Sequence, residues 1–536
     1  MGSRSALATL LVAGAGMLCA ALFAPAAGGQ APAAQCGTTH WVGAWAADPA
    51  GTLGAGFADQ TLRMVLTPHV GGSQLRIHLS NRFGPKPVAF NHAAIGLRQS
   101  GAGIVPGSSH QVTFGGQLGV IVPAGADAVS DPVSMTVAPF QDVAVSLYLM
   151  SPTGPATGHY IARERSYLTG RSAGDHTGDE GAGAFVGSTT TTDYLDGVDV
   201  LGPAGVGAAV LFGDSVTDGY ENAGPGSSEE QGGIDLDHRY PDYLARRLVA
   251  EPGGQRLSVV NAGISGNRLL ADGQGTAAGR SGLSRLDPDV LGVPGVTDAI
   301  VLEGINDIAL LASANQVETA LHQAVDHLHA GGLHVLLGTI PPAGTGLLNL
   351  GTLLPAIYID SSANAVRLAV NTWIRSGASG ADGVVDFDKA LRSATLPNEL
   401  NPDLDSGDHV HPSYLGYKRM ADSIDLSSLR GGQCAAASGR AATTLRVRVA
   451  ARTGRRLHVS GSLTGAGAGC AGTQVTVRIL HGGKTVLKRR LRVTAGCVFS
   501  ATPSVRARGR MEVRESFAGS SGLLPTKARA VFVRMR

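Results

Sequence analysis

The feature that most constrains the fold is an alternation of short apolar runs with helical stretches between about residues 205 and 430. The apolar runs have the length of buried strands, and the intervening stretches have the hydrophobic spacing of helices. Strands separated by helices pair in parallel and lie under helical layers. The sequence therefore predicts a doubly wound α/β domain over 205–432, with strands at 206–212, 257–260, 299–303, 335–340 and 384–387 and helices at 241–251, 317–330 and 362–376.

The segments on either side of this domain have a different pattern, in which apolar and polar residues alternate with a period of two. Gly accounts for 76 of the 536 residues, about twice its usual share of roughly 7%. Period-two runs with frequent turns are typical of antiparallel sheets. We expect an N-terminal antiparallel β-sandwich over 36–200 and a small Ig-like β-sandwich over 434–536. The runs are 62–66, 75–79 and 143–149 in the first segment and 445–449, 475–480, 486–493 and 530–535 in the second.

The net charge of +2 conceals an uneven distribution along the chain. Residues 434–536 contain 20 Lys and Arg but only two acids, Glu512 and Glu515, a net +18, whereas residues 1–433 contain 23 bases and 39 acids, a net −16. A strongly basic segment attracts phosphate-rich or carboxylate-rich polymers and anionic surfaces. We expect the basic segment to bind an anionic cell-wall polymer or surface; an Arg-rich solvated face is the alternative. Nucleic acid is not an expected partner of an exported chain.

The N-terminal segment predicts export. Arg4 precedes an uncharged stretch over 6–27, which contains the small-residue sequence Ala24-Pro25-Ala26. A basic residue, an apolar stretch and a cleavage site of the A-x-A kind are typical of a secretory signal peptide. We therefore expect residues 1–33 to be removed and the mature protein to be secreted, without a transmembrane span. The alternative is a membrane anchor, but Gly14 and Gly16 make the stretch a weak candidate for a membrane-spanning helix.

The cysteine count agrees with export. Removal of the signal peptide leaves Cys36, Cys434, Cys470 and Cys497. An even number of cysteines in an exported chain favours disulfides, and four cysteines allow three pairings. Because Cys470 and Cys497 lie within the basic segment, we expect the pairs Cys36–Cys434 and Cys470–Cys497. Free thiols are the alternative.

Residues suited to catalysis follow four of the predicted strands. In a doubly wound sheet, ligand sites lie beyond the carboxyl ends of the parallel strands. Ser215 follows the first strand in a turn that leads into a helix, and the glycine-rich turn 261–267 follows the second. The segment 303–307 follows the third strand, and 408–412 lies beyond the fifth. Together these segments supply a nucleophile, amide donors and a base.

These segments resemble the SGNH hydrolases, also called the GDSL family of esterases and lipases. The four blocks of that family occur in order: Gly-Asp-Ser with Ser215, a glycine block with Gly266, G-x-N-D with Asn306, and D-x-x-H with Asp408 and His411. The resemblance covers about residues 205–430, and the surrounding sequence is similar to exported bacterial members. It implies a flavodoxin-like three-layer α/β/α domain that hydrolyses carboxylic esters.

The resemblance also implies a role for each residue. Ser215 would attack the ester carbonyl, His411 would take its proton, and Asp408 would orient His411, because a free hydroxyl is a poor nucleophile. The N–H groups of Ser215 and Gly266 and the side-chain amide of Asn306 would form the oxyanion hole. Water would then release the acyl group, and the resemblance implies no metal and no cofactor.

Polar residues beside these blocks have simpler interpretations. We expect Asp214 and Asp307 to support their turns by hydrogen bonds to the backbone, and His409 to point away from the site. The pattern Gly-Asp-x-x-x-Asp-Gly at 213–219 also resembles an element of metallophosphoesterases. The partner motifs of that family are missing, because no D-x-H element precedes Asp214 and no histidine adjoins Asn306.

The substrate is the least determined part of the prediction. The four blocks do not distinguish esterases, lipases and acyltransferases. We expect short-acyl or acetyl esters, with carbohydrate esters as one candidate class. The apolar segment 344–359 favours the alternative of a lipase with a lid, although ordinary packing explains that segment equally well. A third interpretation is a wall-binding or matrix-binding protein with an inactive hydrolase domain.

Overall fold

The computed structural model describes most of the compact unit Cys36–Arg536. The predicted signal peptide and the four cysteines of the predicted disulfides lie outside the described residues. In the part of the chain that is described, no helix is both long enough and apolar enough to cross a membrane. The described residues are 39–160, 162–221, 233–252, 254–273, 278–344, 347–348, 357–358, 361–431, 443–452, 456–465, 473–494, 498–517, 526–527 and 531–535.

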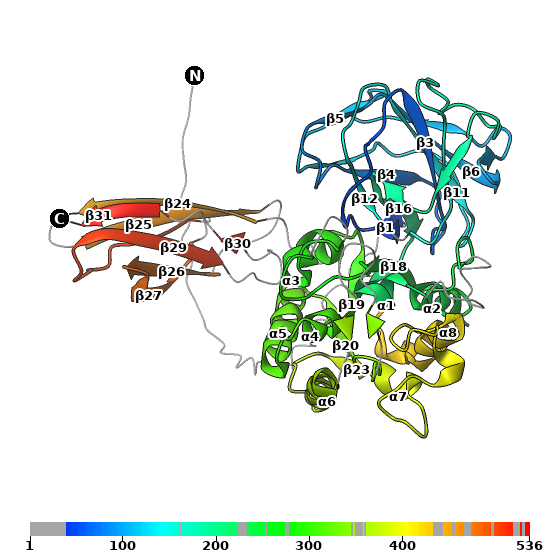
Figure 1. Ribbon diagram of the computed structural model, residues 1–536. Coiled ribbons are helices and arrows are strands. Elements are labelled where there is room, and N and C mark those ends of the chain that lie inside the picture. The colour runs from blue at the N-terminus through cyan, green and yellow to red at the C-terminus, as the bar shows by residue number, and fades with distance from the viewer. Residues whose placement is uncertain are drawn as a thin grey trace, which may run out of the picture. The chain divides into compact units, whose positions relative to one another are not determined.

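A parallel five-stranded sheet forms the centre of the α/β domain, as predicted (Figure 1). Its strand order, β18-β17-β19-β20-β23, is 2-1-3-4-5 in chain order, which is the flavodoxin-like arrangement. The strand order reverses beside β17, so a ligand site is expected at the carboxyl ends of β17 and its neighbours. The strands are β17 (Gly207–Gly213), β18 (Leu257–Gly263), β19 (Val296–Leu302), β20 (His334–Gly338) and β23 (Gly383–Val385).

Helices cover both faces of this sheet (Figure 1). Successive residues of β17 belong to different cores, because side chains alternate between the faces of a strand. Val210 and Phe212 pack against one helical layer, and Ala209 and Leu211 pack against the other. The first layer includes α4 (Ile305–Ala309), α5 (Ala314–Ala330) and α6 (Ser361–Arg375); the second includes α2 (Tyr240–Val249), α7 (Phe387–Leu391) and α8 (Tyr414–Ser423).

The predicted last strand requires a correction at its C-terminal end. The prediction extended it to Phe387, but β23 ends at Val385 and Phe387 is the first residue of α7. The reason is the residue between them. The Asp386 carboxylate accepts a hydrogen bond from the N–H of Lys389 and so caps a helix at this point.

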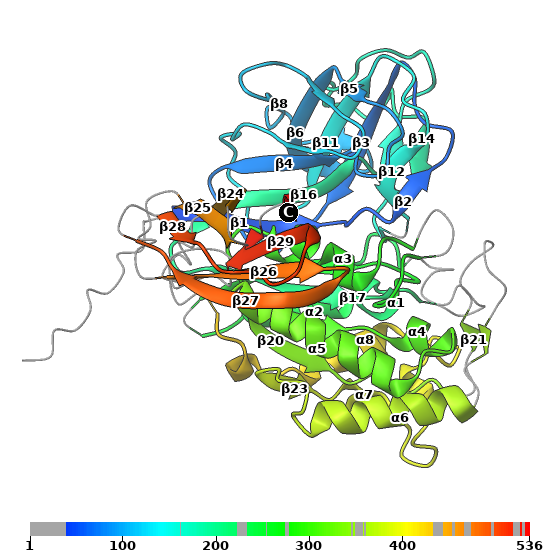
Figure 2. The same ribbon diagram turned by 90° about the vertical axis from the view of Figure 1, so that its left-hand side faces the viewer.

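The two larger antiparallel sheets of the N-terminal region have the orders β1-β16-β4-β10 and β14-β13-β3-β11-β6-β7 (Figure 2). Two smaller antiparallel sheets accompany them in the described residues, one of three strands and one of two. The inward side chains of the two larger sheets, among them Ile77 from the first and Met64 from the second, share one hydrophobic core. The last strand continues to Pro203, three residues past the predicted end of this region. The strands are β1 (Thr39–Ala46), β3 (Gln60–Leu66), β4 (Leu75–Ser80), β6 (His92–Ser100), β7 (Gly103–Ile104), β10 (Asp127–Val129), β11 (Val143–Leu149), β13 (Ser166–Leu168), β14 (Gly187–Thr189) and β16 (Leu195–Pro203).

This region packs directly against the α/β domain. The N–H of Gly43 in β1 donates to the Pro294 carbonyl at 2.9 Å. A side chain at Gly43 would not fit, because its Cβ would lie 2.5 Å from Cγ1 of Val293. Arg82 also reaches across and pairs with the buried Asp289 at 2.9 Å. The two regions therefore share a closely packed, charged boundary.

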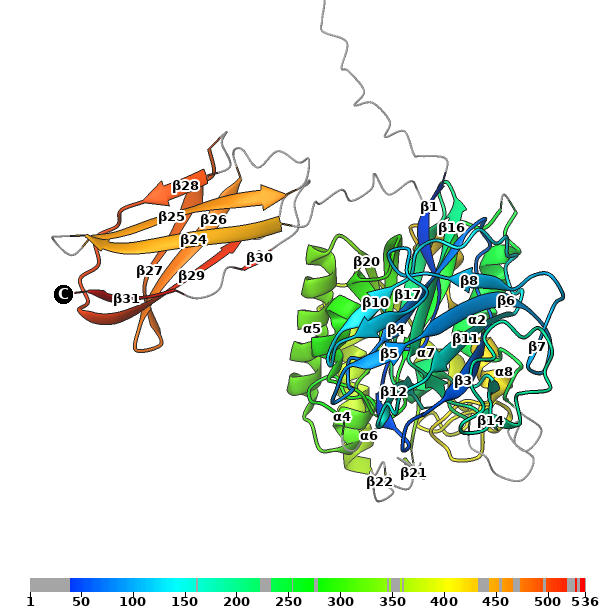
Figure 3. The same ribbon diagram turned by 90° about the horizontal axis from the view of Figure 1, so that it is seen from above.

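The basic C-terminal region also contains two antiparallel sheets (Figure 3). One has the order β24-β25-β28, and the other has the order β27-β26-β29-β30, with β31 also paired to β29. Val459 of the first sheet and Ile479 and Val513 of the second belong to one core cluster. The strands are β24 (Thr443–Arg452), β25 (Arg456–Gly465), β26 (Gln474–His481), β27 (Lys484–Arg492), β28 (Val498–Ala501), β29 (Gly509–Phe517), β30 (Thr526–Lys527) and β31 (Val531–Met535).

Candidate active site

Ser215 lies where β17 passes into a short helix, α1 (Ser215–Asp218). Asp214 caps this helix, because its carboxylate accepts the N–H of Val216 at 3.0 Å. Gly213 allows the tight turn before it, since a Cβ there would lie 2.1 Å from Oγ1 of Thr217. The turn therefore holds Ser215 at the carboxyl end of a central strand.

Three side chains form a continuous chain of hydrogen bonds at this point. Oγ of Ser215 lies 2.8 Å from Nε2 of His411, and Nδ1 of His411 lies 2.6 Å from Oδ2 of Asp408. Ser215 is 5% exposed and His411 is 3% exposed, so little water competes for these bonds. The sequence-predicted nucleophile, base and orienting carboxylate are thus within hydrogen-bond distance of one another.

The surroundings of Asp408 favour its charged form. Its Oδ1 accepts the N–H groups of Val410 at 3.0 Å and His411 at 2.8 Å. Burial acts to raise the pKa of Asp408, but the hydrogen bonds and charge of His411 outweigh it, so the pKa is lowered. The carboxylate accepts the Nδ1 proton of the ring, so Nε2 of His411 faces the hydroxyl of Ser215.

The loop after β18 carries Gly266, which has a φ of +77°. Two contacts hold this loop: the N–H and Oγ of Ser265 donate to Oδ2 of Asp218 at 2.9 and 2.6 Å, and Nδ2 of Asn306 donates to the Asn267 carbonyl at 2.8 Å. Within the described residues, no protein acceptor takes the N–H of Ser215 or of Gly266. Asn306 has a second side-chain N–H, because its amide group carries two.

These side chains lie in a segment that matches a known protein family. Residues 211–419, which include all of the side chains above, match the model of the GDSL-like Lipase/Acylhydrolase family. They form a GDSL-like lipase/acylhydrolase domain. This assignment agrees with the resemblance found in the sequence and places the domain among the carboxylic ester hydrolases.

No curated protein matches the chain. A carbohydrate acetylesterase family member from Sinorhizobium meliloti is 16% identical, over 40% of this chain and 94% of that one, with a TM-score of 0.31. A psychrotrophic esterase, EstA, from a Pseudoalteromonas species is 18% identical, over 40% and 93% of the two chains, with a TM-score of 0.28.

The other polar residues of the GDSL blocks lie close by in different roles. The Asp307 carboxylate accepts the N–H groups of Leu269 at 2.8 Å and Leu270 at 3.0 Å and so holds the segment that follows the Gly266 loop. His409 is 63% exposed, and its ring faces Oδ2 of Asp405 at 2.6 Å instead of Ser215. Among the described residues, no group of three or more His, Cys, Asp or Glu side chains is placed to hold a metal ion.

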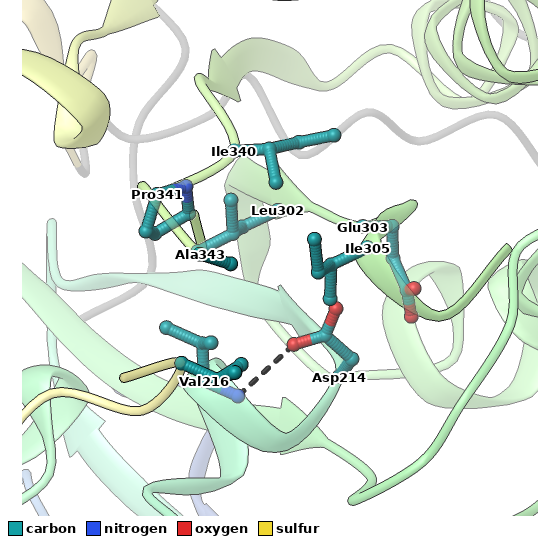
Figure 4. A pocket seen from close by; sticks show the side chains of 9 residues that line it. Asp214, Val216, Leu302, Glu303, Ile305, Ile340, Pro341 and Ala343 are labelled. Atoms are coloured by element: carbon teal, nitrogen blue, oxygen red, sulfur yellow. Dashed lines mark hydrogen bonds between the residues drawn. The ribbon is translucent and has the colours of Figure 1, made fainter. Parts of the chain in front are cut away.

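A small apolar pocket adjoins the active-site turns of the GDSL-like domain (Figure 4). It holds about 280 Å³ of empty space, including its opening to solvent. Burial raises the pKa of its Asp214 carboxyl to about 7 and raises that of Glu303 well above its ordinary value. The pocket is lined by Asp214, Val216, Leu302, Glu303, Ile305, Ile340, Pro341, Ala343 and Val410.

A histidine of the N-terminal region reaches the active-site turns, and no sequence pattern indicated it. His159, in β12 (Ala156–His159), is buried; its Nε2 lies 3.1 Å from Oδ1 of Asp218, and its Nδ1 lies 2.8 Å from the Asp48 carbonyl. An oxygen acceptor lies at each ring nitrogen, which favours the protonated ring. Burial opposes this, but Asp218 outweighs it and raises the pKa of His159. The same Asp218 holds Ser265, so His159 supports the Gly266 loop indirectly.

Tyr220 is a second residue that the sequence did not indicate. Its ring centroid lies 4.6 Å from that of His411, and its carbonyl accepts a hydrogen bond from the Tyr417 hydroxyl at 2.5 Å. The guanidinium of Arg163, from the N-terminal region, lies 5.4 Å from the Tyr220 ring centroid. No motif marks His159, Tyr220 or Arg163, and only their contacts in three dimensions connect them to the site.

Proposed function

We propose that the GDSL-like domain is a serine esterase in which Ser215 attacks the ester carbonyl and His411 takes the Ser215 proton. The observation that carries this proposal is the hydrogen-bond chain from Ser215 through His411 to Asp408, with distances of 2.8 and 2.6 Å. The attack forms a bond from Oγ to the carbonyl carbon. His411 then gives its proton to the leaving alcohol, and the acyl group stays on Ser215.

The oxyanion of this reaction would be stabilised by the N–H groups of Ser215 and Gly266 and by the side-chain amide of Asn306. The support for this assignment is that neither N–H has an acceptor in the described part of the chain, and that the Gly266 loop is held on both sides, by Asp218 and by Asn306. Donors fixed in advance cost no reorganisation when charge develops. Water, deprotonated by His411, then releases the acid from Ser215.

We propose short-acyl or acetyl esters as the substrates. The small apolar pocket beside Val216 and Val410 is lined by neither Ser215 nor His411. This choice therefore rests on the sequence, in which ordinary packing explains the apolar segment 344–359 without a lipase lid. A lipase is the alternative, and it would need a longer channel for the acyl chain. The apolar segment 344–359 is described only in part, where β21 (Leu347–Leu348) pairs with β22 (Ile357–Tyr358).

The test is hydrolysis of p-nitrophenyl esters from acetate to palmitate by the full chain and by Ser215→Ala. Ser423→Ala, at the end of α8, is the matched control. We expect the wild type and Ser423→Ala to hydrolyse acetate and butyrate equally, and Ser215→Ala to lose the activity by a factor of about 10³ or more. Equal hydrolysis by Ser215→Ala would refute the mechanism. A maximum at long chains would favour the lipase, and a wild type without activity would favour the inactive binding protein.

We also propose that the protein is secreted, with the disulfides Cys36–Cys434 and Cys470–Cys497, and that its basic C-terminal region attaches it to an anionic polymer or surface. The uncharged N-terminal stretch, the even cysteine count and the +18 charge of residues 434–536 support this view. The intact mass of protein recovered from the medium tests the first part, because cleavage removes about 33 residues and two disulfides remove four hydrogens. A mass that retains the N-terminal stretch would contradict secretion by this route.

A further inference from the structure

One face of the larger C-terminal sheet is covered with cations. Side chains alternate along its strands: Val477 of β26 and Val513 of β29 point into the core, and Arg478 and Arg514 lie exposed beside them on the other face. Figure 2 shows β27, β26 and β29 side by side. We call this outward surface the basic face. Its exposed cations are Arg478, Lys488, Arg490, Arg492, Arg510, Arg514 and Arg534.

The strand register places these cations opposite one another. Arg478 pairs with Lys488 on one side and with Arg514 on the other, so three cations form a row across three strands. Arg510 pairs with Arg534 in a second row. Like charges directly opposite in a sheet lower its stability. The basic face therefore carries a charge repulsion that a bound anion would relieve.

Little on the basic face neutralises this charge. Glu512 is the one acid among the described residues of the face, and it pairs with Nε of Arg514 at 2.6 Å. The guanidinium of Arg510 lies 4.2 Å from the ring centroid of Phe532. None of the other five cations forms an ion pair within the described residues. They remain available to anions from outside the chain.

We propose that the basic face binds a linear polymer that carries regularly spaced phosphate or carboxylate groups. This inference rests on the proposed attachment role of the C-terminal region and deepens it. Six of the seven cations are Arg, whose planar fork binds phosphate and carboxylate groups through two hydrogen bonds. Cations on the face repeat about every 4.8 Å across strands and about every 6.8 Å along a strand, so an extended polymer can contact several rows at once.

The face fits a polymer better than a lipid bilayer. Proteins that lie on membranes insert apolar and aromatic side chains between the lipids. The exposed aromatic residue on this face is Phe532, and the guanidinium of Arg510 lies over its ring. Gln474 and Thr476, which are opposite Arg492 and Arg490, add hydrogen-bonding groups instead of apolar ones. A polar surface with dense Arg binds oxyanions without insertion.

The test compares two full-chain triple variants of equal charge. Arg478→Gln, Lys488→Gln and Arg490→Gln together change the basic face. Arg456→Gln, Arg506→Gln and Arg508→Gln remove the same charge from exposed positions elsewhere in the region. The probes are long-chain inorganic polyphosphate, poly-L-glutamate, and vesicles of phosphatidylcholine and phosphatidylglycerol, with affinity measured at low and high salt. The two polymers distinguish a phosphate source of the oxyanions from a carboxylate source.

We expect the face variant to lose about tenfold or more of its affinity for at least one polymer, and the control variant to lose less than about threefold. Equal losses would overturn the proposal, because net charge alone would then explain binding. Tighter binding to vesicles than to either polymer would overturn it as well. The Tm of the face variant should be equal to or above that of the wild type, since like-charge pairs are removed.

Ester hydrolysis in the same samples separates this proposal from the proposed activity. All three proteins should hydrolyse p-nitrophenyl acetate at equal rates, because none of the six substituted residues belongs to the described active site. A wild type that hydrolyses the ester but binds neither polymer would refute the attachment role alone. A wild type that binds polymer without hydrolysis would refute the esterase and leave the basic face intact.

Discussion

The residues proposed for catalysis are brought together by one local contact and one long-range contact. Asp408 and His411 are held locally, because one carboxylate accepts both the ring proton and the backbone N–H of a residue three positions later. The D-x-x-H block predicted this pairing through its resemblance to the family. Ser215 lies 196 residues from His411, and their 2.8 Å contact depends on the whole α/β domain. The sequence predicted that contact only through the order of the strands and the resemblance to a family.

Asp408→Asn tests the orienting role at the scale of one residue. An amide is neutral and can donate, so it no longer holds the Nδ1 proton of His411 in place or stabilises the charged ring. We expect kcat for p-nitrophenyl acetate to fall by about 10³–10⁴, with KM changed little.

Asp405→Asn is the matched control, because Asp405 also faces a histidine, the exposed His409. We expect its kcat to stay within about twofold of the wild type. A comparable loss of kcat in both variants would mean that the segment 405–411 had been disturbed as a whole and that Asp408 has no separate role.

At the scale of the element, the strands and helices of the α/β domain were largely predictable. Long helices such as α5 (Ala314–Ala330) have an apolar face that repeats every three to four residues, and the buried strands are continuous apolar runs. The prediction was wrong at Phe387, where one capping aspartate changes an apolar residue from the end of a strand to the start of a helix. Apolar periodicity does not detect such a cap, which depends on a single side chain.

The contact of β12 with the active-site turns lies beyond what a sequence pattern can indicate. His159 and Asp218 are 59 residues apart and belong to different regions, and neither stands in a motif that requires the other. The contact links three elements, because Asp218 at the end of α1 also binds both the N–H and the Oγ of Ser265. We therefore expect His159 to act as a positioning residue for the Gly266 loop.

His159→Gln tests this link. The pKa of His159 is raised in the folded protein, so its contribution to stability is full below the unfolded pKa of about 6.5 and is lost as pH rises through the folded pKa. The difference in Tm between wild type and variant should thus be larger at pH 6 than at pH 9. At pH 6 the substitution should also lower kcat by a larger factor than it changes KM, because the Gly266 loop stabilises the transition state.

His327→Gln serves as the control, since His327 is an exposed histidine that also faces an aspartate, Asp287. Its Tm should follow that of the wild type at both pH values. If His159→Gln behaved in the same way, with a pH-independent Tm difference and an unchanged kcat, the link from β12 to the Gly266 loop would be contradicted.

At the scale of the whole molecule, the charge is divided by region. The basic surface lies on a C-terminal β region, whereas the acidic part of the chain contains the GDSL-like domain and the N-terminal sheets that pack on it. The division by composition was visible in the sequence, but the alignment of the cations on one face was not. It required the register of β26, β27 and β29, which places Arg478, Lys488 and Arg514 in one row.

The central claim is that Ser215 carries the acyl group during turnover. The most direct measurement is mass spectrometry of the full chain, followed by peptide mapping. The chain is first treated with a fluorophosphonate, or mixed with p-nitrophenyl acetate and quenched rapidly with acid. We predict one added group, on the peptide that contains Ser215, and no added group on Ser215→Ala. A label on another residue, or ester hydrolysis without any label on Ser215, would contradict this account.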